Sequence, residues 1–155
     1  MNRKRIIVWF AALLLPLSLM GQDNKVFRVG IDASVDCFDF SGTSGGDRIL
    51  IRPSYGRGVR ARLGGYDQWF NLVGGVRYIY GPRLSGFQVP ILLNVNLLKG
   101  RQVSGYLGGG YEFDFIGTYW GCMKVQAGLA GKHADFRVFY KPYQGDVGVG
   151  ITYFF

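Results

Sequence analysis

The sequence predicts an all-β fold: one domain folded as an eight-stranded antiparallel barrel of the up-and-down type. The chain has 155 residues, which suffice for one domain of ordinary size but not for two. Glycine contributes 25 residues, and Phe, Trp and Tyr contribute 12, 3 and 10. Glycine weakens helices and aromatic rings favour pleated strands, so this composition excludes a helical bundle. Apolar side chains also alternate with polar or small ones along most of the chain, which is the pattern of strands.

The alternation is clearest in the last segment. Every odd position from Val147 to Phe155 is apolar, whereas the even positions are polar or glycine, with Phe154 as the exception. The same period of two recurs seven more times along the chain. The predicted strands are residues 26–35, 47–63, 68–80, 86–98, 103–116, 121–131, 134–142 and 146–155.

The connections between these strands predict their topology. Only the segment Asp36–Gly46 is long, and it is rich in Gly, Ser and Asp. The other links are short, at residues 64–67, 81–85, 99–102, 117–119, 132–133 and 143–145. Short links force consecutive strands to be antiparallel neighbours, so a meander is expected.

The first 21 residues predict a cleaved signal peptide. Arg3, Lys4 and Arg5 precede an apolar run from Ile6 to Met20 that is too short to span a bilayer. We expect cleavage after Gly21, which leaves residues 22–155 as the barrel domain. The net charge of +8 could suggest nucleic acid, but the basic residues are scattered singly and an exported chain rarely meets it, so no nucleic-acid partner is expected.

The two faces of the strands predict a transmembrane barrel rather than a soluble one. A membrane barrel turns its apolar face to lipid and its polar face inward. Strands of ten to thirteen residues tilted by about 45° project roughly 23–30 Å, close to the ~25 Å apolar band of such barrels. Aromatic residues near strand ends suit the two membrane interfaces. They are Phe87, Phe115, Tyr78, Tyr80, Tyr153 and Phe155.

The polar face predicts a charge network in the lumen. The predicted network consists of Arg28, Asp32, Arg52, Arg60, Arg62, Arg77, Glu112, Asp114, Lys124, Arg137 and Lys141, and Gln126 and the acidic Asp135 lie on the same face. Glycines beside long charged residues leave room for them in the narrow lumen of eight strands. A turn centred on residue 118 places Glu112 opposite Lys124, so we predict an ion pair between them.

A resemblance accompanies these residues. The terminal run Tyr153-Phe154-Phe155, with the runs Gln88–Asn94 and Tyr106–Phe113, is similar to the small outer-membrane β-barrels of Gram-negative bacteria, in particular PorT-like and OmpX-like domains. The resemblance implies the bacterial outer membrane as location, with lipid and lipopolysaccharide as partners. It also implies that Tyr153 and Phe155 form the signal read by the barrel-insertion machinery.

The sequence offers little chemistry for catalysis, metal binding or a cofactor. Some barrels of the resembled kind are lipid A deacylases or palmitoyltransferases that use histidine and serine together, but the single histidine, His133, has no serine beside it. One His and two distant Cys give no metal-ligand spacing. Export would allow a disulfide between Cys37 and Cys122, with two free or oxidised thiols as the alternative.

We therefore expect a non-enzymatic barrel with a structural or interaction role in the cell envelope, where another envelope protein could dock on the long loop. Two alternatives remain at this point. One is a narrow pore or carrier, in which the excess of basic side chains would favour anions. The other is a soluble periplasmic barrel that binds a ligand.

Overall fold

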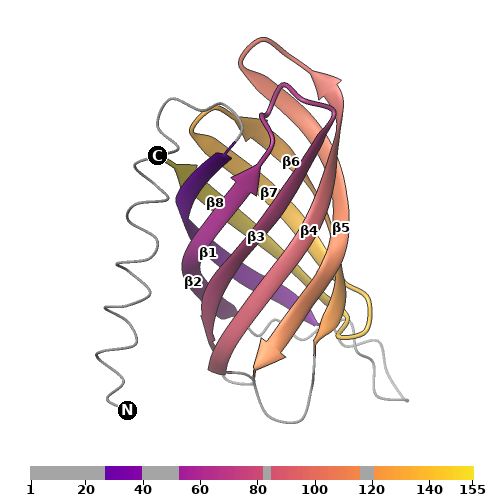
Figure 1. Ribbon diagram of the computed structural model, residues 1–155. Coiled ribbons are helices and arrows are strands. Elements are labelled where there is room, and N and C mark those ends of the chain that lie inside the picture. The colour runs from indigo at the N-terminus through magenta and orange to yellow at the C-terminus, as the bar shows by residue number, and fades with distance from the viewer. Residues whose placement is uncertain (1–26, 40–52, 82–84, 116–120) are drawn as a thin grey trace.

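The computed structural model describes residues 27–39, 53–81, 85–115 and 121–155. They form a closed barrel of eight antiparallel strands in sequential order, which confirms the predicted fold class (Figure 1). The strands are β1 (Phe27–Asp39), β2 (Ser54–Leu63), β3 (Phe70–Tyr80), β4 (Ser85–Lys99), β5 (Val103–Phe115), β6 (Cys122–Gly131), β7 (Ala134–Lys141) and β8 (Asp146–Phe154). The predicted signal peptide lies outside the described residues.

The barrel closes because β1 pairs with β8 as well as with β2. We call the end that holds Phe27, Phe155 and the β2–β3, β4–β5 and β6–β7 links the turn end, which is uppermost in Figure 1. The opposite end is the loop end. Gly64 directly follows the last residue of β2 at the turn end. Its φ is 105°, a conformation that glycine adopts without strain.

The boundaries of β3 to β8 were predicted within two residues, but the predicted end of β1 and the predicted start of β2, on either side of the long loop, were wrong. β1 continues to Asp39, because a bulge between Asp36 and Phe38 lets it keep pairing with β8. Asp36 and Cys37 thus lie on a strand rather than in the loop. β2 begins only at Ser54, after Pro53, and the predicted strand residues 47–52 lie outside the described residues.

The predicted register of the β5–β6 hairpin was also wrong. The hairpin is centred on residue 117 and not on residue 118. Glu112 lies opposite Cys122, and Lys124 lies opposite Gly110. Glu112 and Lys124 are therefore diagonal neighbours on the same face. Diagonal partners on a sheet are still within reach of long side chains.

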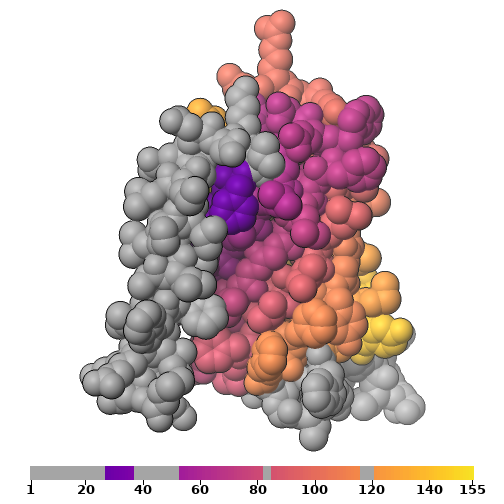
Figure 2. All heavy atoms as spheres, viewed as in Figure 1, coloured from indigo at the N-terminus to yellow at the C-terminus, as the bar shows by residue number. Residues whose placement is uncertain are grey.

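The two faces of the barrel wall differ sharply in chemistry. Inward side chains are buried and mostly polar, whereas outward ones are exposed and mostly apolar. Side chains of β2 to β5 form much of the outer surface in Figure 2. Among the described side chains of the strands, Arg57 and Lys99 are the charged ones that are exposed. Phe154, which breaks the alternation of β8, points inward and is fully buried.

Candidate functional site in the barrel lumen

Charged side chains fill the lumen of the barrel. Within the described strands, seven basic and five acidic side chains are buried: Arg28, Arg60, Arg62, Arg77, Lys124, Arg137, Lys141, Asp32, Asp36, Glu112, Asp114 and Asp135. Arg52, the remaining member of the predicted network, lies outside the described residues. Burying charges is unfavourable unless they are paired and hydrogen-bonded, so their contacts decide what the lumen does.

Glu112 on β5 is the centre of the largest group of contacts, which we call the Glu112 cluster. Its carboxylate accepts bonds from Arg77 Nη2 at 2.8 Å, Lys124 Nζ at 2.9 Å and Lys141 Nζ at 3.0 Å. The predicted Glu112–Lys124 ion pair is thus present. Lys141 also bonds to Asp36 Oδ2 at 3.0 Å. Strands β1, β3, β5, β6 and β7 meet here, so the cluster ties opposite walls of the barrel together.

Arg77 has a partner for each of its donor groups. Its Nε donates to Gln88 Oε1 at 2.8 Å, and its Nη1 donates to Ser34 Oγ at 3.0 Å. Phe139 lies among the cations of the cluster, with Lys124 Nζ 3.9 Å from the centre of its ring. A cation over an aromatic face is attracted by the ring quadrupole, so Phe139 supplements the single carboxylate of Glu112.

A second group surrounds Asp32 on β1, and we call it the Asp32 cluster. Asp32 Oδ1 accepts hydrogen bonds from Arg137 Nη2 at 2.5 Å and from Thr152 Oγ1 at 2.6 Å. Arg60 Nη1 lies 3.8 Å from the same oxygen. Asp135 in turn accepts a bond from the Tyr106 hydroxyl at 3.0 Å and lies 3.7 Å from Arg137 Nη1.

Carboxamide side chains link the Asp32 cluster to the turn end. Arg60 Nη2 donates to Gln126 Oε1 at 3.2 Å, and Gln126 Nε2 donates to Asn94 Oδ1 at 2.7 Å. Asn94 then donates to Asn71, and Asn71 to Asn96. This series of hydrogen bonds crosses the lumen from β2 to β6 and then returns to β4 and its neighbour β3.

Two glycines of β8 make room for the large side chains that face them. A Cβ at Gly150 would lie 2.7 Å from the guanidinium of Arg137, and a Cβ at Gly148 would overlap the ring of Phe139. The sequence-based expectation that glycines leave space for long side chains holds at these positions. The result is a dense interior.

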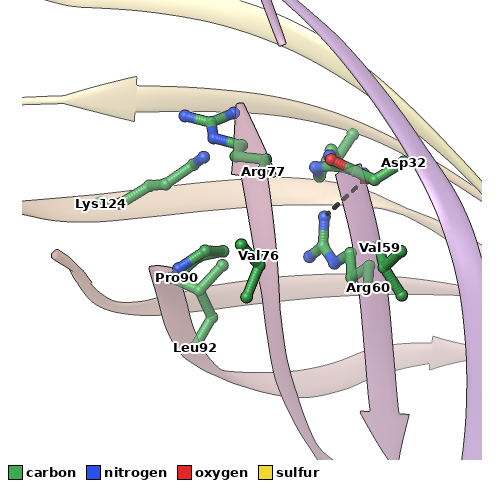
Figure 3. A pocket seen from close by; sticks show the side chains of 9 residues that line it. Asp32, Val59, Arg60, Val76, Arg77, Pro90, Leu92 and Lys124 are labelled. Atoms are coloured by element: carbon green, nitrogen blue, oxygen red, sulfur yellow. Dashed lines mark hydrogen bonds and ion pairs between the residues drawn. The ribbon is translucent and has the colours of Figure 1, made fainter. Parts of the chain in front are cut away.

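A cavity of about 10 Å³ lies in the lumen, next to the wall between β3 and β4 (Figure 3). Arg60, Arg77 and Lys124 converge on it, with Pro90 and Leu92 on the other side. Pro90 has no amide hydrogen to donate, and the β3–β4 ladder is interrupted there. A space of this size holds about one water molecule.

The remaining predicted residues lie near the barrel ends. Asp114 accepts a bond from Gln88 Nε2 at 2.5 Å near the loop end. Tyr153 and Phe155 point outward at the turn end, 56% and 50% exposed, with their rings 5.8 Å apart. His133 Nδ1 lies 3.1 Å from the carbonyl oxygen of Phe154, to which it can donate. Whether Tyr153 and Phe155 act as an insertion signal stays a prediction.

The two cysteines lie on different strands, Cys37 on β1 and Cys122 at the start of β6. Cys122 is buried, and its thiol forms no disulfide with another described side chain. Cys37 lies on β1 at the bulge, but its side chain is outside what the structure describes. The Cys37–Cys122 disulfide therefore stays a prediction.

Several contact residues were missed by the sequence reasoning. Asp36 was assigned to the loop, although its even position continues the inward set of Asp32 and Ser34. Tyr106 and Phe139 were not singled out, because an aromatic residue at an inward position looks the same in sequence as one at an outward position. Tyr106 has an even number, as does the inward Glu112 on the same strand β5, and Phe139 has an odd number, as does the inward Arg137 on β7. This shared spacing of two was the signal that could have identified both as inward residues.

No protein-family model matches the chain, and no curated protein matches it significantly. Among the described residues, no group of three or more His, Cys, Asp or Glu side chains is placed to hold a metal ion. The described part of the chain also contains no helix long and apolar enough to cross a membrane.

Proposed function

We propose that the chain is a small outer-membrane β-barrel of the PorT-like or OmpX-like kind, with a structural or interaction role in the cell envelope and no enzymatic activity. It is exported by the signal peptide of residues 1–21, and residues 22–155 enter the membrane. Lipid and lipopolysaccharide cover its outer face, and the insertion machinery reads the terminal aromatic residues. Another envelope protein docks at the loop end.

The observation that carries this proposal is the chemistry of the outward face. Large apolar side chains in the middle of the strands are half exposed, among them Ile91, Leu93 and Leu107 at 47%, 50% and 54%. In water, such a continuous apolar belt would drive aggregation. In a bilayer it would be satisfied, since the closed ladder leaves no strand edge unpaired.

Outward aromatic residues near both ends add a second support. Tyr55, Tyr78, Tyr80 and Phe87 lie near the loop end, and Phe70 and Tyr153 lie near the turn end. Amphipathic rings of this kind favour the two interfaces of a membrane. Arg57 is flanked by Tyr78 on β3 and lies three residues from the start of β2, so its charge would reach the headgroup region.

The dense lumen favours a structural or interaction role over a pore. The Glu112 cluster and the Asp32 cluster cross the interior, and the cavity beside Pro90 has room for about one water molecule. A narrow pore or an anion-favouring carrier is the second candidate, because basic side chains outnumber acidic ones in the lumen. Planar-bilayer recording separates the two: steady openings would favour the pore.

Cell fractionation with gel mobility tests the location. We expect the protein in the outer-membrane fraction, and we expect its band to shift when the sample is boiled, because folded barrels run anomalously until heated. Release by osmotic shock, with no heat-dependent shift, would instead indicate the soluble periplasmic barrel. Mobility with and without a reducing agent would decide the disulfide in the same samples.

A further inference from the structure

The turn end of the lumen holds two arginines that face each other, and neither forms an ion pair with an acidic side chain among the described residues. Arg28 on β1 lies directly opposite Arg62 on β2 in the register, and both side chains point inward. Arg28 is 8% exposed and Arg62 is 1% exposed. Like charges directly opposite on neighbouring strands are destabilising, and burial strengthens the repulsion.

The hydrogen bonds of Arg62 do not go to an acidic group. Both of its Nη atoms donate to one neutral acceptor, the carbonyl oxygen of Gly131, at 3.3 and 3.2 Å. Its Nε is buried without a hydrogen-bond partner. The guanidinium carbon lies 4.5 Å from the centre of the Phe154 ring, which attracts the cation but accepts no conventional hydrogen bond.

Arg28 has still fewer contacts. Within the described residues, no hydrogen bond or ion pair joins it to another group. Among the described side chains, Asp135 is the acidic one at this end of the lumen. It attracts Arg62 electrostatically, but its hydrogen bond and its ion pair within 4 Å go to Tyr106 and Arg137, not to Arg28 or Arg62. This arrangement contrasts with Glu112, where one carboxylate serves three cations.

A buried hydroxyl without a partner lies at the same end. Ser104 on β5 is fully buried, and its Oγ has no hydrogen-bond partner. Ser104 pairs with Ala130 on β6, the residue next to the Gly131 that receives Arg62. The turn end therefore combines two facing guanidinium groups, a free Nε–H and a free hydroxyl, all of which can donate hydrogen bonds to an anion.

We propose that Arg28 and Arg62 form a binding site for a phosphate-type oxyanion at the turn-end mouth of the lumen. Guanidinium groups match tetrahedral oxyanions because each presents two parallel N–H donors to two oxygens. One dianion between the two arginines would offset the repulsion that the chain itself leaves in place. Arg28 is the more exposed of the two arginines, so an anion that enters from the turn end would reach it first. The site does not depend on the surroundings of the barrel's outer face.

Thermal unfolding of the detergent-folded protein tests the site, with gel mobility as the measure of folded chain. Inorganic phosphate is compared with sodium chloride at equal ionic strength, because salt alone would screen the repulsion. A third arm adds phosphatidylglycerol to the micelles without free phosphate. The variants are Arg28→Gln, the conservative Arg28→Lys, and Arg57→Gln as a control that removes an arginine from the outer face.

We expect phosphate to raise the unfolding midpoint of the wild type and of R57Q beyond the effect of chloride. The increase should be lost in R28Q and reduced in R28K, since lysine keeps the charge but not the planar fork. An increase with phosphatidylglycerol alone, with the same dependence on Arg28, would assign the oxyanion to a lipid headgroup.

Three results would overturn the site: no increase with either probe, an increase no larger than with chloride, or an equal increase in R28Q. If R28Q does not fold, R28K decides. A midpoint shift in R28K equal to that of the wild type would then contradict the proposed role of Arg28.

Discussion

The inner and outer faces of the same strands obey opposite rules. On β5, Glu112 is fully buried among three cations, whereas its sequence neighbours Tyr111 and Phe113 are about 40% exposed and pack edge to face against each other. In a soluble protein of this size the apolar face would be the buried one. The inversion means that ion pairs and hydrogen bonds hold the inside of this barrel together, and it is the reason for proposing that lipid surrounds the outside.

The largest effect should come from removing the charge of Glu112 without changing its size. In Glu112→Gln, three buried cations lose their shared carboxylate, so we expect the free energy of unfolding to fall by about 3–5 kcal/mol. Denaturant titration of the folded band in detergent measures it. The neighbouring outward change Tyr111→Phe is the matched control. Equal effects of the two variants would contradict the contrast between the faces.

A charge placed on the outer face should come next. Leu93 lies at the middle of β4, 50% exposed, and an arginine there would meet the centre of a bilayer. We expect Leu93→Arg to destabilise the barrel in lipid vesicles by about 2–4 kcal/mol, and Leu98→Arg near the turn end by at most about 1 kcal/mol. If the two variants unfold alike in vesicles, the outer face has no depth-dependent environment.

Charge exchange across the β5–β6 hairpin probes one contact of the inner face. Glu112→Lys and Lys124→Glu should each destabilise the barrel, and the double variant should recover about 0.5–3 kcal/mol of that loss. The recovery is incomplete because Arg77 and Lys141 also face position 112. If the double variant is no more stable than the less stable single variant, the Glu112–Lys124 ion pair does not contribute to stability.

The smallest effect should come from an outward aromatic contact. The rings of Tyr78 and Phe87 lie 5.1 Å apart in an edge-to-face arrangement. We expect Tyr78→Leu to lower the unfolding free energy by about 0.5–1.5 kcal/mol. The same titration measures it, with Tyr143→Leu at the exposed β7–β8 link as control. A loss as large as that of Glu112→Gln would mean that the outer face, rather than the lumen, dominates stability.

The fold could be predicted from sequence because alternation and short links are local signals. They placed β3 to β8 within two residues, and the parity of each strand put Arg60, Lys124 and Arg137 on the inner face. The end of β1 could not be read locally. Residues 36–39 resemble a loop in composition, and they form a strand because β8, more than a hundred residues later, pairs with them.

Contacts across the lumen were harder to predict than the faces. A hairpin suggests Glu112 and Lys124 as neighbours, but nothing local brings Arg77 of β3 and Lys141 of β7 to the same carboxylate. Their convergence depends on closure of the barrel and on the register of every strand between them. The Arg28–Arg62 pair was missed for a related reason, since the register of β1 with β2 depends on the length of the loop that joins them.

Spin labelling at position 93 tests most directly whether the outer face meets lipid. A label is attached to Leu93→Cys in a chain whose two native cysteines are replaced by serine, and the barrel is folded into vesicles. Collisions with molecular oxygen, which concentrates in the bilayer, should be frequent, whereas collisions with a water-soluble nickel complex should be rare. The opposite result, frequent collisions with the nickel complex and few with oxygen, would place Leu93 in water and contradict the inverted arrangement of the two faces.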